Sequence, residues 1–223
     1  MRVLLLLLLG TSILLSAGPS WAAGETALQQ RLESWPNWQL PGPLPRPAGG
    51  DDLIYPDWFE GRWELTSIDL DAPDGPALIY EARFQRDSGG RLVGDRSFNA
   101  ASVGKALLGD QLLRVETDPS SANRQMAQFR DDQLLETSVT GRRQETQGES
   151  GFLADELVLQ IMRGSGPPRL SRIETLSRYE RCGNDICAEQ WQATYPAPGD
   201  SLRNQAVRTN HFGMQLSPLQ SHN

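Results

Sequence analysis

The spacing of apolar residues changes at Gly61. From there on, apolar side chains recur at every second position, as in Trp63 and Leu65 or in Ala82 and Phe84. A period of two is typical of a β-strand with one buried face. Besides the runs at 61–66 and 78–85, similar runs lie near residues 91–98, 111–117, 124–130, 133–143, 152–162, 169–181, 186–195 and 205–215. About ten consecutive strands with few helices predict a mainly β fold, either a meandering antiparallel barrel or a sandwich.

The residues before these strands show a different pattern. Thr26 and Gln29 have the spacing of a capping box, and Pro36 ends the short helix that they begin. Five prolines between positions 36 and 47 then favour an extended strap. We therefore predict a helix and a proline-rich strap within residues 23–54.

The rest of the chain divides simply. Residues 55–217 form the predicted β-barrel domain, and residues 218–223 form a predicted disordered tail. One segment, residues 99–109, interrupts the strands and predicts a helical turn or a lid over one end of the sheet.

Residues 1–22 have the order of a secretory signal peptide, with Arg2, an apolar run, and small residues at Ser20 and Ala22. We predict cleavage after Ala22. The apolar run of 13 residues, 3–15, is shorter than the roughly 20 residues that span a membrane. The mature chain is therefore expected to be exported and to keep no integral membrane segment.

Charge narrows the range of partners. The formal charge of −7 becomes −8 when residues 1–22 are removed, because they contain one arginine and no acidic residue. Of the 21 basic residues only Lys105 is a lysine, and the arginines are scattered along the chain. An acidic protein without a basic run is not expected to bind nucleic acid or an anionic membrane.

Cys182 and Cys187 flank a turn of Gly183, Asn184 and Asp185 between two predicted strands. Four intervening residues place the two sulfur atoms opposite each other across a hairpin, and an oxidising compartment joins such pairs. We predict a structural disulfide. The alternatives are a metal site, which lacks further ligands, and a redox pair, which usually has two intervening residues.

The aromatic turn that begins at Tyr55 leads into Gly61-x-Trp63. This motif resembles the opening motif of the lipocalins and related calycin barrels. The resemblance implies an antiparallel up-and-down barrel of about 8–10 strands. It also implies that Trp63 closes one end of the barrel and that an arginine from a late strand packs across its ring. Arg208 stands at the corresponding place.

A second resemblance covers most of the mature chain. The matching stretches are Trp35–Trp38, Tyr55–Phe59, Asp95–Ser102, Asp118–Arg124 and Glu189–Tyr195. They are similar to an uncharacterised family of exported cyanobacterial and chloroplast thylakoid-lumen proteins. This resemblance implies a location in the periplasm or thylakoid lumen of a photosynthetic organism and brings no activity with it.

Sequence motifs for catalysis are absent. The chain has no His-Glu-x-x-His, no Gly-x-Ser-x-Gly and no phosphate loop around Lys105. His211 and His222 are the only histidines. We expect His211 to be an outward polar residue, and the alternative is an axial haem ligand, as in haem-binding calycins such as the nitrobindins. The sequence favours a non-catalytic protein without metal or cofactor.

Strand alternation points to candidate ligand residues. If Leu92 and Phe98 face the barrel interior, Arg96 faces it too, and Asn210 faces it from the last strand. A buried arginine needs an acidic partner or an anionic ligand. We predict that a small amphipathic or anionic molecule binds at Tyr80, Arg96, Asn99 and Asn210. The alternative for Arg96 is a fixed salt bridge that closes the barrel.

Two other functions remain open. The protein could be a structural or assembly protein that binds a lumenal partner through its surface, with Trp35, Trp38 and the proline strap as the docking element. It could also be a calycin-type enzyme, such as a chromophore lyase or cyclase, which requires an acid and base pair that the sequence does not identify.

Overall fold

The computed structural model describes residues 25–48, 51–199 and 204–219. The predicted signal peptide, residues 1–22, and most of the predicted tail, residues 218–223, lie outside the described residues. The helices are α1 (Ala27–Glu33) and α2 (Arg96–Leu108), with 3₁₀ turns at Asp57–Phe59 and Gly109–Gln111. The strands are β1 (Gly61–Asp69), β2 (Leu78–Arg86), β3 (Leu92–Gly94), β4 (Leu112–Asp118), β5 (Ser121–Phe129), β6 (Leu134–Gln147), β7 (Gly151–Arg163), β8 (Arg169–Cys182), β9 (Asp185–Tyr195) and β10 (Arg208–Pro218).

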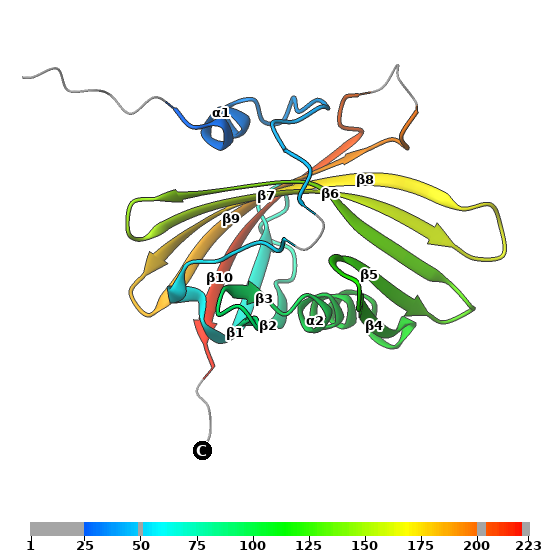
Figure 1. Ribbon diagram of the computed structural model, residues 1–223, viewed down its shortest axis with the longest axis horizontal. Helices are drawn as coiled ribbons and strands as arrows, with labels where there is room; N and C mark the ends of the chain where they lie inside the picture. The colour runs from blue at the N-terminus through cyan, green and yellow to red at the C-terminus, as the bar shows by residue number, and fades with distance from the viewer. Residues whose placement is uncertain (1–24, 49–50, 200–203, 220–223) are drawn as a thin grey trace, which may run out of the picture.

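The ten strands form one antiparallel sheet in the order β3-β2-β1-β10-β9-β8-β7-β6-β5-β4. The sheet curls into a half-barrel (Figure 1). Strands that follow one another in sequence are paired except β3 and β4, and β1 is also paired with β10. Because β1 pairs with β10, with Leu65 opposite Leu216, the two edges of the sheet are β3 and β4. The predicted mainly β, up-and-down architecture is confirmed.

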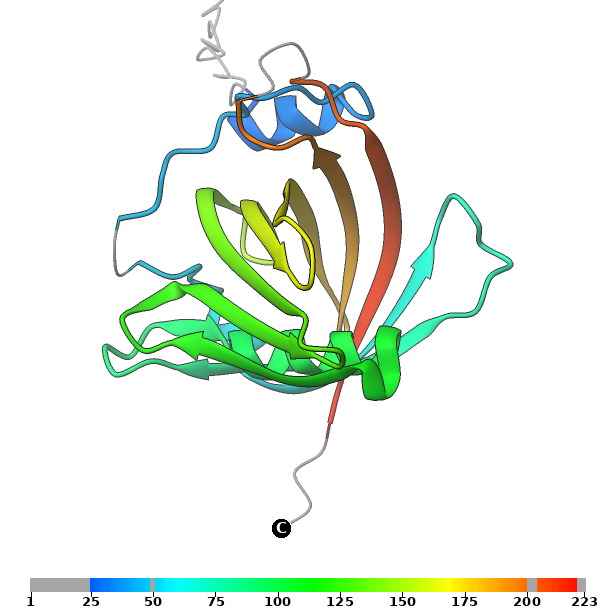
Figure 2. The ribbon, with the colours of Figure 1, turned by 90° about the vertical axis from the view of Figure 1, so that its right-hand side faces the viewer.

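Helix α2 lies between the two edges of the sheet, where it contacts β2, β4 and β5 (Figure 2). Its side chains replace a strand partner along β2. The amide of Asn99 accepts a hydrogen bond from the backbone nitrogen of Arg83 and donates one to the Arg83 carbonyl oxygen. The hydroxyl of Ser102 accepts a hydrogen bond from the backbone nitrogen of Glu81. The half-barrel is thus closed by a helix instead of by a β3–β4 ladder.

The predicted strand at 91–98 is wrong beyond Gly94. The side chain of Asp95 accepts a hydrogen bond from the backbone nitrogen of Phe98, and this N-cap starts α2 at Arg96. The segment 99–109, predicted as a helical turn or lid, belongs to the same helix and the 3₁₀ turn after it.

The two faces of the sheet bury separate apolar clusters. Along β7, Phe152 and Ala154 join the inner cluster, whereas Leu153 between them joins the outer cluster. The outer cluster lies beneath α1 and the proline-rich strap, on the side of the sheet opposite α2 (Figure 1). This alternation assigns every position of the central strands to one face.

The outer cluster is covered by what we call the N-terminal clasp, residues 27–46. Thr26 and Gln29 form the predicted capping box of α1. Trp38 is 1% exposed, and its indole Nε1 donates a hydrogen bond of 2.7 Å to the carbonyl oxygen of Arg31. Leu28 and Leu40 are also buried against the sheet. The predicted short helix and strap are therefore present as one packed cover.

Cys182 and Cys187 form the predicted disulfide across the β8–β9 hairpin, with their Cα atoms 5.9 Å apart. Gly183 takes a φ of +71° in the turn between them. This conformation is open to glycine and costly for most other residues.

The predicted packing of Arg208 across Trp63 is wrong. Trp63 is buried, and its indole Nε1 donates a hydrogen bond of 2.8 Å to the carbonyl oxygen of Phe59. The strand register places Trp63 opposite Pro218, whereas Arg208 begins β10 at its other end, opposite Thr194. The Arg208 side chain is exposed there, and its Nε lies 3.3 Å from Oδ1 of Asn210.

Within the described ranges, no helix is both long enough and apolar enough to cross a membrane.

Candidate ligand site in the half-barrel

One end of the interior is filled by aromatic side chains. Phe59 and Phe152 are 0% and 1% exposed, and their ring centroids lie 6.0 Å apart. Tyr55 and Tyr179 pack on Phe59 with centroids 4.9 Å and 5.1 Å away. Trp63, Leu65 and Leu216 belong to the same cluster. We call this part of the interior the closed end.

A layer of charged side chains follows the closed end along β7. We call Asp52, Arg96, Arg142 and Glu156 the charged septum. The guanidinium of Arg96 donates hydrogen bonds of 2.7 Å to Asp52 and 2.8 Å to Glu156. Arg142 donates one of 2.6 Å to Glu156 and another of 2.7 Å to the carbonyl oxygen of Asp51. Two carboxylates thus face two guanidinium groups.

The septum is electrically balanced. Burial alone would raise the pKa of Glu156, but the guanidinium groups of Arg96 and Arg142 outweigh burial and lower this pKa. Burial alone would lower the pKa of Arg96, but the negative charges of Glu156 and Asp52 outweigh burial and raise this pKa. Because each charge has a partner, this geometry matches the fixed salt bridge that the sequence left as the alternative for Arg96.

Arg96 and Asn99 do lie together, on the first turn of α2. With Tyr55, Gly94 and Gln125 they line a small cavity of about 180 Å³. The guanidinium of Arg96 already binds two carboxylates, and both polar atoms of Asn99 already bind the backbone of Arg83. Nε2 of Gln125 is buried without a hydrogen-bond partner among the described residues. The cavity is smaller than most ligand pockets.

The other two predicted ligand residues lie elsewhere. Tyr80 packs against the closed end, where burial, with a smaller contribution from Tyr179, raises the pKa of its hydroxyl. Asn210 faces the interior from β10, and its amide lies 3.4 Å from that of Gln192. Three strand pairings separate Asn210 from Glu156, through Gln192 and Thr175. The four predicted residues therefore do not converge on one ligand.

Beyond the septum the interior is open. We call this part the open half. Its inner face carries a row across five strands, in the order Val139, Val158, Ile173, Thr194 and Arg208. The first four side chains are half-buried, and Arg208 is exposed. Among the described residues that face inward from β6–β10 beyond Glu156, none is acidic.

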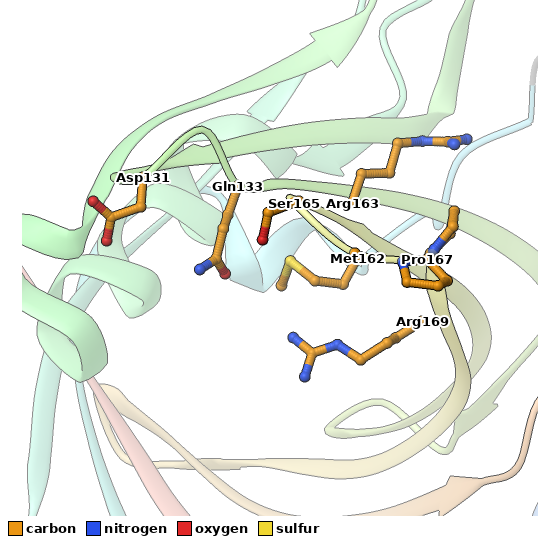
Figure 3. A pocket seen from close by; sticks show the side chains of 10 residues that line it. Asp131, Gln133, Met162, Arg163, Ser165, Pro167 and Arg169 are labelled. Atoms are coloured by element: carbon orange, nitrogen blue, oxygen red, sulfur yellow. The ribbon is translucent and has the colours of Figure 1, made fainter.

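At the mouth of the open half lies a pocket of about 570 Å³. It is built from the β5–β6 turn at Asp131 and Gln133 and from the facing ends of β7 and β8. Met162, Gln133 and Arg169 point toward a common space, whereas Arg163 points away (Figure 3). Arg163 instead forms an ion pair of 2.8 Å with Glu136. The volume is in the range of small-molecule sites.

His211 lies on the outer face of β10, opposite Trp191. Its ring stacks on the indole of Trp191 at 5.0 Å between centroids, and its Nε2 lies 3.1 Å from Oε2 of Glu189. Among the described residues, no three His, Cys, Asp or Glu side chains are placed to share a metal ion.

Sequence reasoning missed two acidic residues of β7, one of which, Glu156, is a partner of Arg96. Asp155 and Glu156 interrupt the apolar run of residues 152–159. Adjacent strand residues face opposite sides of a sheet, so each of these acids requires its own polar environment. That pair of acids within an apolar strand was the available signal.

Comparison with known families gives one result. Residues 47–217 match the family described as Domain of unknown function (DUF6816). The chain belongs to this family. The matched residues include the sheet up to Ser217, the septum and the mouth, and they begin directly after the N-terminal clasp. No curated protein and no solved structure matches the chain significantly.

Proposed function

We propose that this DUF6816 protein is an exported, non-catalytic binding protein that holds a small amphipathic anion in the open half. The observation that carries the proposal is that the side chains lining the interior differ between the closed end and the open half. The closed end is packed with aromatic side chains, whereas beyond the septum the inward-facing residues of β6–β10 are mostly half-buried, and none of those described is acidic.

The lining indicates the class of ligand. Val139, Val158 and Ile173 offer an apolar surface, and Met162 continues it to the mouth. Arg169 and Arg208 face inward at the rim of this surface. A molecule with an apolar body and a carboxylate or sulfonate group meets both needs, because guanidinium groups bind such anions well.

The location belongs to the same proposal. The Cys182–Cys187 disulfide favours an oxidising compartment, which supports export to a periplasm or thylakoid lumen. The rival function, docking through Trp35, Trp38 and the proline strap, is less favoured because Trp38 is buried between the clasp and the sheet and Trp35 packs edge-on against it.

A titration with 8-anilinonaphthalene-1-sulfonate, a fluorescent amphipathic anion, tests the proposal. We expect saturable binding with one site per chain. Arg169→Gln should weaken it about tenfold, since one charge-assisted hydrogen bond contributes roughly 1.5–3 kcal/mol. Arg181→Gln is the matched control, because Arg181 is exposed on the same strand beyond the closed end. Equal affinities for the two variants, or no saturable binding, would contradict the proposal.

A further inference from the structure

A second charged cluster lies on the outer face, beneath the N-terminal clasp. Asp155 of β7 and Glu174 of β8 are both 0% exposed. They are diagonal neighbours, since Asp155 pairs with Leu176 and Glu174 pairs with Leu157. The nearby cation is Arg31 of the clasp, which donates hydrogen bonds of 2.8 Å and 2.7 Å to the two carboxylate oxygens of Glu174.

The hydrogen bonds in this cluster are unevenly shared. Glu174 receives both bonds from Arg31 and a third from the hydroxyl of Tyr195. Both carboxyl oxygens of Asp155 lack a hydrogen-bond partner among the described residues. An ionised carboxylate in such a place costs several kcal/mol, whereas a protonated one can donate to a neighbouring carboxylate.

Among the described residues, no cation is hydrogen-bonded to Asp155. Arg143 lies opposite it on β6, but its Nε donates a hydrogen bond of 2.7 Å to the carbonyl oxygen of Pro43. Glu145, also on β6, accepts a hydrogen bond from the backbone nitrogen of Leu28. Glu156 is next in sequence and faces the septum. Arg31 of α1 therefore binds Glu174 directly and acts on Asp155 only through its charge.

The clasp seals this cluster by close contact. A Cβ atom added at Gly42 would lie 3.2 Å from Oε1 of Glu174 and 3.5 Å from Nη2 of Arg31. Arg31 also lies over the ring of Trp38, 4.8 Å from its centroid. Displacement of the clasp would remove the cation and expose both acids to water.

We propose that Asp155 carries a proton while the N-terminal clasp is docked, so that docking is coupled to protonation and the clasp opens as the pH rises. The coupling follows from the different surroundings of Asp155 in the two states. In the docked state, burial and then the negative charge of Glu174 raise the pKa of Asp155 well above its ordinary value. In the open state water surrounds Asp155, and its pKa returns to the ordinary value of an aspartic acid.

The sign of the effect is fixed by this difference. The docked state binds one more proton than the open state at any pH between the two pKa values. Docking is therefore strongest below the ordinary pKa of an aspartic acid and weakens as the pH rises toward the raised value. The opening equilibrium should increase by up to about tenfold per pH unit in this interval.

Hydrogen exchange of the full mature chain, followed by mass spectrometry between about pH 5 and pH 9, measures this opening. We expect protection factors of peptides within residues 27–40 to fall with rising pH, while those of β1 and β10 stay constant. Asp155→Asn keeps the shape of the side chain without its titration and should make the clasp protection independent of pH.

Two further variants keep the test decisive. Glu136→Gln removes a half-buried, ion-paired acid at the other end of the sheet's outer face and should leave the pH dependence as in the wild type. Asp155→Leu also removes the titrating group and replaces Asp155→Asn in the test if that variant does not fold. Its clasp protection should likewise be independent of pH. A clasp protection that is independent of pH in the wild type, or equally pH-dependent in a folded variant of Asp155, would overturn the proposal.

Discussion

Two adjacent acidic residues of β7 serve opposite faces of the sheet. Glu156 points inward and binds Arg96 and Arg142, whereas Asp155 points outward, beside Glu174 and under the clasp. Their neighbours in sequence are apolar, so both carboxyl groups depend on partners that are distant along the chain. Asp52 and Arg96 reach the inner site from outside the central strands.

Arg96→Ala should lower the free energy of unfolding by about 3–5 kcal/mol, because in a mostly buried site it leaves Asp52 with only a long ionic contact of 3.9 Å to Arg142 and removes one of the two partners of Glu156. That cost is similar to the roughly 3–5 kcal/mol expected for Trp63→Ala in the closed end. Denaturant midpoints measure both. Arg163→Ala, which breaks the exposed pair with Glu136, is the control and should cost about 0–1 kcal/mol.

A wild-type midpoint for Arg96→Ala would contradict the bracing role and would restore Arg96 as a ligand residue. Sequence reasoning concluded correctly that Arg96 needs a negative partner. The conclusion rested on strand alternation, although Arg96 lies in helix α2. The partner could not be named, because Asp52 and Glu156 are 44 and 60 residues away in sequence.

At the scale of elements, α2 takes the place of a neighbouring strand along part of the edge of β2. The hydrogen-bonding groups at the edge of β2 are met by Asn99 and Ser102 instead of by β4. An uncovered strand edge is a site of unwanted pairing between chains. The helix therefore protects the edge as well as closing the half-barrel.

Asn99→Ala should cost about 1–2 kcal/mol of unfolding free energy, since it removes two hydrogen bonds to the backbone of Arg83. Thermal unfolding checks this. The control is Asn210→Ala, which removes two long contacts, 3.4 Å to Gln192 and 3.3 Å to the exposed Arg208, and should change stability by less than about 0.5 kcal/mol. Equal effects of the two substitutions would show that Asn99 does not brace β2.

Most elements could be predicted from local pattern. The period of two located the strands, the Thr26 capping box located α1, and the short Cys182–Cys187 spacing identified the disulfide. The start of α2 was missed because Leu92 and Phe98 are an even number of positions apart, which also fits two inward-facing residues of a strand. The N-cap at Asp95 decides the conformation there, and one aspartate is a weak signal by itself.

At the scale of the whole molecule, the half-barrel has two unlike ends separated by the charged septum. The sequence predicted a barrel with a closed end near Trp63, and this residue is buried in the aromatic cluster. The contents of the open half could not be predicted, because they depend on the register of five strands. The same register overturned the pairing of Arg208 with Trp63.

The measurement that tests the account most directly is the affinity of 8-anilinonaphthalene-1-sulfonate for two tryptophan variants of β8. Ile173→Trp adds a large side chain to the inner face of the open half, opposite Val158. Leu170→Trp adds the same side chain at an exposed position on the outer face of the same strand. We predict that Ile173→Trp abolishes saturable binding and that Leu170→Trp binds like the wild type. Undiminished binding by a folded Ile173→Trp variant would contradict a ligand site in the open half.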